Sequence, residues 1–160
     1  MKDSIIISQA DESQLLKVSE LTYDGILHWG GHIFTDIEPW VRTTCDLSKL
    51  AELRHKGYLL VAIDGSEIVG TASGSLGDDG WVLGGIYVSK KNCGIGHELA
   101  LQVLKEGYER GYKIAYSYVY EHNVGSLKFL KRFGAVEVDD EVTVGHRYIK
   151  VAIELKGNLL

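Results

Sequence analysis

The sequence predicts a mixed α/β (α+β) fold with a mostly antiparallel central sheet that carries helices on both faces. Three observations point to this class. The apolar patterns follow the order strand, helix, helix, three strands, helix, strand, helix, two strands. Asp64-Gly65 joins two β-rich runs, as in a tight hairpin. With 160 residues the chain has the length of one domain, and we assign residues 1–160 to it.

The chain begins with a strand and a helix. The run SIIIS, Ser4–Ser8, is rich in β-branched residues and predicts a strand. Asp11 is a suitable N-cap for the amphipathic helix that follows. The pair Gly30-Gly31 is expected to end this helix.

A loop and a second helix come next. The segment HIFTDIEPW, residues 32–40, is expected to be a loop, with Pro39 in that loop or at a helix start. The second helix is predicted over Leu47–Lys56, closed by Gly57. From Tyr58 the pattern changes to the hairpin strands.

The middle of the chain predicts a strand and then a long helix. Trp81–Val88 reads as a strand antiparallel to the one before it. The following helix has an apolar stripe at helical spacing. The stripe consists of Ile95, Leu99, Ala100, Val103, Leu104 and Tyr108.

The last third alternates strands with one short helix. Lys113–Tyr120 has the period of a strand. A short helix over Ser126–Phe133 is expected to end at Gly134. Ala135–Val138 and His146–Leu155 supply the last two strands.

Composition narrows the classes of partner and compartment. With 17 Lys and Arg against 22 Asp and Glu, the net charge of −5 argues against nucleic acid and favours a cation such as an amine. The opening apolar run is too short for a signal peptide, and no segment is long enough to span a membrane. Cys45 and Cys93 lack metal-site spacing and do not predict a disulfide, so we expect a soluble, cytoplasmic protein. A homodimer is left open.

The stretch KKNCGIGHELALQVLKEGYERG, Lys90–Gly111, places two glycines before the long helix. The first N–H groups of a helix lie at the positive end of its dipole, where an anion binds well. Gly94 and Gly96 remove the side chains that would keep an anion away. The alternative is a tight turn that needs glycine only for its backbone angles. Neither a P-loop nor a dinucleotide-binding fingerprint fits the residues that follow.

Two motifs together resemble the GNAT superfamily of N-acetyltransferases. The first is the strand, Gly-x-Gly loop and helix of YVSKKNCGIGHELALQVLKEGYERG, and the second is VYEHNVGSLKFLKRFGA. In the second motif Val119, Asn123, Ser126 and Gly134 take the places of the family pattern. The two motifs span Trp81–Ala135 in the family's order.

The resemblance implies that acetyl-coenzyme A (acetyl-CoA) is the cosubstrate. In this family the loop amides hold the pyrophosphate, and the pantetheine arm lies between two splayed strands, here Trp81–Val88 and Lys113–Tyr120. The cofactor-binding residues implied in this way are Val88, Cys93, Gly94, Ile95, Gly96, His97, Glu98, Asn123 and Ser126. Basic residues available to the phosphates are Lys90, Lys91, Lys128, Lys131 and Arg132, with a merely solvated face as the alternative.

The sequence departs from the family at several positions. Leu130 stands where many members carry a tyrosine that protonates the leaving thiolate, and Gly84 and Gly85 stand where others place a carboxylate. Lys91 or Asn92 stands near the place of the loop Arg or Gln, and Ala135 replaces a Phe. General acid–base catalysis contributes about 10²–10⁴-fold, whereas positioning supplies about 7–11 kcal/mol.

We therefore expect an enzyme that transfers acetyl from acetyl-CoA to a primary amine of a small molecule, peptide or protein. The alternative is a non-catalytic acyl-CoA-binding or interaction module of the same fold. Candidate catalytic residues are Tyr120, Glu121 and Tyr87, with His122 beside them. For each, a surface or core role is the alternative.

Two further groups complete the candidates. His28, Trp29, His32, Phe34 and Trp40 are expected to line an acceptor pocket, with core packing of the aromatics as the alternative. Asp24, His28 and His32 have metal-ligand spacing, but Gly30-Gly31 interrupts the helix between them, so no metal site is predicted. Cys93 is expected to fill the loop.

Overall fold

The computed structural model describes residues 5–30, 38–90, 93–143 and 145–157. Within these residues, seven strands form one sheet in the order β1-β2-β3-β4-β5-β7-β6. Neighbouring strands are antiparallel except β4 and β5, which are parallel, so the predicted mixed and mostly antiparallel sheet is confirmed. The strands are β1 Ile5–Gln9, β2 Tyr58–Asp64, β3 Glu67–Gly77, β4 Gly80–Val88, β5 Ile114–Tyr120, β6 Val136–Thr143 and β7 His146–Glu154.

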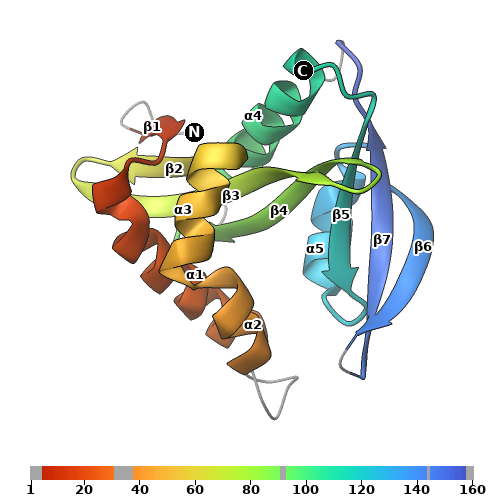
Figure 1. Ribbon diagram of the computed structural model, residues 1–160, viewed down its shortest axis with the longest axis horizontal. Coiled ribbons are helices and arrows are strands. Elements are labelled where there is room, and N and C mark those ends of the chain that lie inside the picture. Colours follow the sequence, from red (N-terminus) through yellow and green to blue (C-terminus); the bar gives the residue numbers. More distant parts are fainter. Residues whose placement is uncertain (1–4, 31–37, 91–92, 144, 158–160) are drawn as a thin grey trace.

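Helices cover both faces of the sheet, as predicted (Figure 1). A 3-10 turn, Glu12–Gln14, precedes the first helix. The helices are α1 Leu15–Gly30, α2 Glu38–Thr44, α3 Leu47–Lys56, α4 Ile95–Glu109 and α5 Val124–Lys131. Figure 1 shows α1 and α3 in front of the sheet and α4 and α5 behind it. No helix in the described part of the chain is long and apolar enough to cross a membrane.

The core has one cluster on each face of the sheet. In β2, Leu60 and Ala62 point into the cluster that contains α4, whereas Leu59 and Val61 point into the cluster below α1 and α3. Successive side chains of a strand point to opposite faces, so one apolar run serves both clusters. This explains why YLLVAI in β2 is almost wholly apolar.

Trp81 anchors β4 to α4. Its side chain is fully buried, and its Nε1 donates a hydrogen bond to the carbonyl of Val103, 2.9 Å away. Gly74 and Gly107 make room for the ring, because a Cβ at either position would lie 2.2 or 2.4 Å from it. The start of β4 is thus held rigidly against the helix behind it.

Several predicted boundaries are wrong; the strand predicted at Ala135–Val138, for example, is β6 over Val136–Thr143. Part of the segment expected to be a loop forms α2, whose first turn contains Pro39. A proline there costs no helical hydrogen bond, and Glu38 pairs with Arg42 one turn later at 3.0 Å. Helix α5 begins at Val124 rather than at Ser126, because Asn123 caps it.

Candidate functional site

Strands β4 and β5 form a fork. Their parallel pairing consists of Trp81↔Ala115 and Val82↔Tyr116, although β4 continues to Val88 and β5 to Tyr120. Figure 1 shows the two strands side by side at one end and far apart at the other. Beyond Val82 no strand of the described residues pairs with the inner edges of the fork, so their backbone groups are available to an extended ligand.

A β-bulge lies in β4 at the point where the fork opens. Ser73 pairs with Gly84 and Thr71 pairs with Tyr87, so β4 has one residue more than β3 in this interval. Gly85 adopts a positive φ of 26° there. The extra residue changes the alternation, so that Leu83 before it and Ile86 after it both face the α4 cluster.

The backbone N–H of Val88 points into the fork. The next residue, Ser89, donates its N–H to the carbonyl of Val69 in β3, 3.0 Å away. Successive residues of a strand direct their N–H groups to opposite edges. The N–H of Val88 is therefore directed away from β3, toward the side on which β5 diverges.

The N-terminus of α4 carries the predicted glycine pair. Gly94 is the N-cap and needs glycine, since its φ of 77° is left-handed. Gly96 does not need glycine for its own packing: a Cβ there would meet Val88 at 3.5 Å, Ile86 at 3.8 Å and Phe129 at 4.0 Å, all ordinary contacts. Glycine at position 96 thus leaves space between α4, β4 and α5 that an alanine would fill.

One of the amides at this helix start makes a hydrogen bond within the helix. The N–H of Glu98 already donates to the carbonyl of Gly94, 3.0 Å away. The first turn therefore presents the N–H groups of Ile95, Gly96 and His97. The predicted cofactor contact of Glu98 stays a prediction; its side chain accepts a hydrogen bond from Gln102 at 3.1 Å.

Helix α5 forms a wall beside the start of α4. The His97 ring stacks on Phe133 with a centroid distance of 4.8 Å, and Phe133 contacts Phe129 edge-on at 5.4 Å. Phe129 also borders the space at Gly96. The open side of the fork, the α4 amides and α5 therefore surround one region.

Residues Asn123 and Ser126 lie at the start of α5. The Oδ1 of Asn123 accepts the N–H of Ser126 at 3.2 Å, which caps the helix. The Asn123 side chain thus has a structural use that the motif alone does not show. Its Nδ2 amide donates to no group in the described part of the chain.

The matching family model is the acetyltransferase (GNAT) family, over residues 27–135. The chain belongs to the GNAT acetyltransferase family. It is therefore an acetyltransferase by class, as the two sequence motifs predict. No curated protein sequence matches it significantly.

Solved structures with the same fold cover this GNAT chain almost completely. The PaiA N-acetyltransferase of Thermoplasma acidophilum, solved with coenzyme A, has a TM-score of 0.80 at 20% identity, over 94% of this chain and 99% of its own. The putative acetyltransferase YncA of Salmonella typhimurium, solved with acetyl-CoA, has a TM-score of 0.74 at 17% identity, over 97% and 96%. The Escherichia coli ribosomal-protein-S18-alanine N-acetyltransferase has a TM-score of 0.73 at 15% identity, over 95% and 94%.

The departures of this GNAT protein from the family pattern have structural counterparts. Leu130, at the position of the expected tyrosine, is buried among core residues. A side chain at Gly84 would meet the hydroxyl of Ser73 at 2.8 Å, and one at Gly85 would be strained by its positive φ. The contact with Ser73 therefore accounts for Gly84, and the positive φ at the bulge accounts for Gly85, where other family members place a carboxylate.

Tyr120 lies at the end of β5 in a group of aromatic rings. It is buried and contacts His122 at 5.2 Å, His146 at 5.7 Å and Tyr148 at 6.1 Å between ring centroids. Burial, followed by Tyr120 and then Glu141, raises the pKa of Tyr148 to about 12. The end of β5 thus lies among tyrosine and histidine rings.

The carboxylate of Glu121 lies between Arg147 and His122. Arg147 lies 3.6 Å from it, and His122 lies 3.6 Å from its other oxygen. Arg147 in turn bonds to Asp140 at 2.8 Å. Arg147 thus contacts the carboxylates of both Glu121 and Asp140. Glu121 is therefore part of a network of charged side chains at the surface and is not a lone carboxylate in the fork.

Tyr87 lies on the opposite face of the sheet from the α4 cluster. It packs against the cluster below α1 and α3, with its ring directly against Gly25 of α1. Burial, and to a smaller extent the Cys45 thiol, raises the pKa of the Tyr87 hydroxyl above its usual range. Tyr87 is thus covered by α1, whereas Tyr120 lies at the end of β5 among tyrosine and histidine rings.

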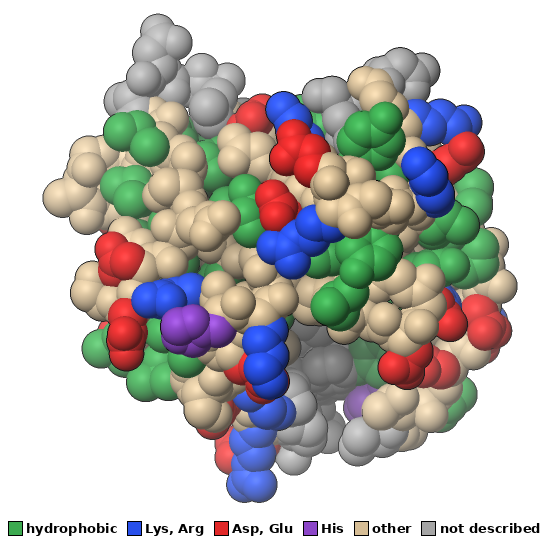
Figure 2. Space-filling model, turned by 45° about the horizontal axis from the view of Figure 1, so that its top comes forward, with side chains coloured by type: hydrophobic (Ala, Val, Ile, Leu, Met, Phe, Trp, Pro, Cys, Tyr) green, Lys and Arg blue, Asp and Glu red, His purple; other side chains and the backbone are tan. Residues whose placement is uncertain are grey.

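The predicted basic residues fall into two groups. Lys90 is bound to Asp64 at 2.8 Å, and Lys131 lies 4.0 Å from Glu137. Lys128 and Arg132 make no ion pair with any described residue. Lys91 lies outside the described residues. Figure 2 shows positive and negative side chains interspersed over the visible face, without a large patch of one sign.

The predicted acceptor-pocket residues are largely untested. His32 and Phe34 lie outside the described residues, as do the side chains of Trp29 and Trp40. His28 is exposed on α1. Among the described residues, no three His, Cys, Asp or Glu side chains are grouped to hold a metal ion.

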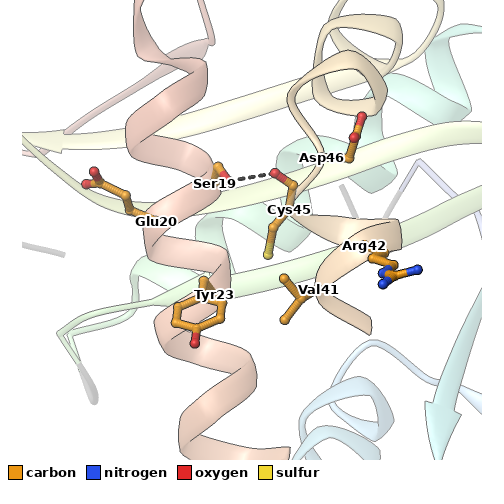
Figure 3. A pocket seen from close by; sticks show the side chains of 7 residues that line it. All are labelled: Ser19, Glu20, Tyr23, Val41, Arg42, Cys45 and Asp46. Atoms are coloured by element: carbon orange, nitrogen blue, oxygen red, sulfur yellow. Dashed lines mark hydrogen bonds between the residues drawn. The ribbon is translucent and has the colours of Figure 1, made fainter. Parts of the chain in front are cut away.

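The structure has an open pocket of about 400 Å³ between α1 and α2 that the sequence did not predict. Figure 3 shows its lining, which comes from α1, α2 and the turn before α3. Its residues are Ser19, Glu20, Tyr23, Val41, Arg42, Cys45 and Asp46. The Ser19 hydroxyl donates to the Cys45 carbonyl at 2.6 Å and joins the two sides. Contacts between residues so far apart in the chain leave no local pattern in the sequence.

Proposed function

We propose that this GNAT protein transfers the acetyl group of acetyl-CoA to a primary amine of a small molecule, a peptide or a protein. The observation that carries the proposal is the fork between β4 and β5, which opens beside a glycine-lined helix start. The fork would hold the extended pantetheine arm of coenzyme A, and the helix start would hold its anionic pyrophosphate.

In this proposal the pyrophosphate binds the amides of Ile95, Gly96 and His97. Gly96 leaves the space for its approach, and Cys93 and Gly94 complete the loop. Two solved structures of similar fold hold coenzyme A or acetyl-CoA, which supports this cosubstrate. Lys128 and Arg132 are the basic residues that we assign to the phosphates, since Lys90 and Lys131 have acidic partners.

The pantetheine arm is proposed to lie in the fork. There Val88 offers its N–H, and Asn123 offers the Nδ2 of its capping side chain, at the start of the helix that contains Ser126. The thioester then lies toward the end of β5, next to Tyr120. The N–H of Val88 is also the donor that we assign to the oxyanion of the tetrahedral intermediate.

Catalysis is proposed to depend on positioning. The neutral amine attacks the thioester carbonyl and forms the C–N bond, and the tetrahedral intermediate collapses by cleavage of the C–S bond. The nitrogen loses one proton to solvent, and the departing coenzyme A thiolate takes up a proton from solvent to give the free thiol. Holding the two reactants in line supplies about 7–11 kcal/mol, more than general acid–base catalysis contributes. Leu130, Gly84 and Gly85 cannot exchange protons, and Tyr87 is assigned a structural role because its ring packs below α1.

We further propose a single domain, since one sheet runs through the described residues from β1 to β7. We place the protein in the cytoplasm. A chain with two cysteines that lack the spacing of a disulfide framework suits a reducing compartment.

The test combines two measurements on the same protein. Calorimetry with coenzyme A measures cofactor binding, and release of free thiol from acetyl-CoA with a panel of amines and peptides measures transfer. We expect binding together with amine-dependent thiol release. Tight binding without turnover for any amine would instead support a non-catalytic acyl-CoA-binding module, and absence of binding would refute the assigned site.

A further inference from the structure

Strand β6 forms an exposed edge of the sheet. It pairs with β7 on one side, and all eight of its residues, Val136–Thr143, are exposed. Figure 1 shows it as the outermost strand beside β7. The outer edge of such a strand carries backbone N–H and C=O groups that another extended chain can pair with.

The acidic side chains of β6 divide between the two faces of the sheet. Paired residues of antiparallel strands point to the same face. Glu137 and Asp140 are paired with Val151 and Ile149, which belong to the core on the α5 side. Glu137 and Asp140 therefore point to the α5 side, and the other two acidic residues of β6 point to the opposite face of the sheet.

Asp139 and Glu141 lie on the face opposite α5. They are paired with Lys150 and Tyr148 of β7, which are paired with Tyr118 and Tyr120 of β5. On this side of the sheet α1 and α3 pack over β2, β3 and β4. The exposed ring of Tyr118 belongs to this face, which we call the open face: Tyr116, Tyr118, Tyr148, Lys150, Asp139 and Glu141.

The charges on the two faces differ. On the α5 side Glu137 lies 4.0 Å from Lys131, and Asp140 bonds to Arg147 at 2.8 Å. On the open face neither Asp139 nor Glu141 forms an ion pair with a described residue. The open face of β6 therefore carries two carboxylates without a cation.

The cation of the open face, Lys150, already has an acidic partner. The Nζ of Lys150 bonds to Asp79 at 2.6 Å and lies 4.4 Å from the centre of the Tyr116 ring. It is thus turned away from Asp139, its partner in the strand register. In this arrangement the Tyr116 ring and the carboxylate of Asp79, from the turn before β4, bind the ammonium group together.

A second copy of the chain fits this edge poorly. Antiparallel pairing of two β6 strands would bring four acidic residues of one against four of the other. Like charges across paired strands are destabilising. The complementary occupant is a positively charged strand.

We propose that the edge of β6 binds an extended basic polypeptide segment by strand addition, with Lys or Arg at alternate positions facing Asp139 and Glu141. Those two residues are separated by one position, about 7 Å along the strand, which matches the spacing of residues i and i+2 in the added chain. This inference does not depend on acetyl transfer.

The test measures binding of two labelled eight-residue peptides by fluorescence anisotropy. In one, lysine alternates with valine and threonine; the other has the same composition with its lysines in a single block. The alternating peptide places all its lysines on one face, so we expect it to bind at least about threefold tighter. Raising the ionic strength from about 0.1 M to about 1 M should remove most of the difference, because the Debye length shortens from about 10 Å to about 3 Å.

Matched variants identify the face. Asp139→Asn with Glu141→Gln should weaken the alternating peptide by about threefold to tenfold, because each exposed ion pair contributes little alone. Glu137→Gln, on the opposite face of the same strand, is the control and should change its affinity by less than twofold on the same basis. All three side chains are exposed, so folding should be unaffected.

Three results would overturn the proposal. Equal affinity for both peptides would indicate unspecific attraction to a negative surface. No binding of either peptide would mean that the acidic residues only keep edges of the sheet apart. A concentration-dependent dimer that Val142→Lys abolishes, measured by light scattering, would assign the edge to a second copy.

Discussion

The Tyr87 ring occupies the space that a side chain at Gly25 would need. A Cβ on Gly25 would lie 2.3 Å from Cδ1 of Tyr87, closer than non-bonded carbon atoms approach. This contact lets α1 lie close to β4, one strand of the fork. A glycine within a helix is unfavourable by about 0.5–1 kcal/mol relative to alanine, so its presence here indicates that close packing outweighs helix propensity.

Gly25→Ala should therefore destabilise the fold by about 1 kcal/mol or more, because overpacking costs about 1–3 kcal/mol and exceeds the propensity gain. Urea denaturation measures the change. Gly125→Ala in α5 is the control, since its Cβ would have 3.9 Å to the nearest atom, and it should not destabilise. In a double-mutant cycle, Tyr87→Leu should cost less in the Gly25→Ala background than in the wild type. Equal costs would contradict the steric explanation.

The second prediction separates folding from cofactor binding at Gly96. Gly96→Ala should leave the free protein as stable or raise its stability by up to about 1 kcal/mol, because its Cβ makes ordinary contacts in a helix. Coenzyme A affinity should fall at least about tenfold, since each lost charge-assisted hydrogen bond is worth about 1.5–3 kcal/mol. Gly96→Asp should weaken it further through charge repulsion.

Thermal denaturation without ligand and calorimetry with coenzyme A give both quantities on the same sample. A stable Gly96→Ala variant with unchanged coenzyme A affinity would show that this glycine does not make room for the phosphates. Loss of both stability and affinity would point instead to a packing role that the distances around Gly96 do not indicate.

The third prediction compares two lysines that the sequence treats alike. Lys128→Gln should weaken coenzyme A binding by about threefold to tenfold, and more at low salt, because its charge has no acidic partner in the described part of the chain. Lys90→Gln should have little effect, since Lys90 is bound to Asp64. A larger loss for Lys90→Gln would reverse our assignment of the phosphate-binding charges.

Much of the fold could be predicted because its signals are local. The alternation in β5, the apolar stripe of α4 and Asp64-Gly65 each determine an element within a few residues. Helix α2 was missed because seven residues hold too short an apolar pattern to identify a helix. The bulge in β4 was missed because its apolar run reads as one uninterrupted strand, although Gly84-Gly85 was the available signal.

The site was predictable only in part. The need for a glycine at position 94 and the amides of the α4 start follow from the sequence, whereas the fork came from the resemblance to GNAT proteins. That α1 covers Tyr87, whereas Tyr120 lies at the end of β5 beyond this helix cover, depends on the bulge and on how the sheet is covered. Such long-range packing leaves no local pattern around either tyrosine.

The fourth prediction concerns alkaline pH. Burial, Tyr120 and Glu141 raise the pKa of Tyr148 to about 12, whereas an unfolded tyrosine titrates near about 10. A pKa raised in the folded state means that the stability is fully present below the unfolded value and is lost as pH rises through the folded value. The free energy of unfolding should therefore decrease between about pH 10 and about pH 12.

Tyr148→Phe should make this decrease shallower, as measured by urea denaturation at several pH values in that window. Tyr118→Phe is the control for loss of a tyrosine, because Tyr118 is 44% exposed on the neighbouring strand. An unchanged slope in Tyr148→Phe would mean that other groups cause the alkaline loss, with the more deeply packed Tyr87 as the next to replace.

The last prediction concerns whether an acid or base of the protein limits the rate of acetyl transfer. Because Leu130 is a core residue and Gly84 and Gly85 carry no ionisable group, we expect no protein acid or base to limit acetyl transfer. The attacking amine must be neutral, so kcat/KM should rise with pH and level off near the pKa of the acceptor itself. Two acceptors whose amine pKa values differ should therefore give profiles with different midpoints, and Tyr87→Phe should leave both profiles unchanged.

If both acceptors instead shared one midpoint, a group of the protein would be titrating. The profiles of Tyr120→Phe and Glu121→Gln would then identify it, since a true general base or acid contributes about 10²–10⁴-fold and its removal abolishes that limb of the profile.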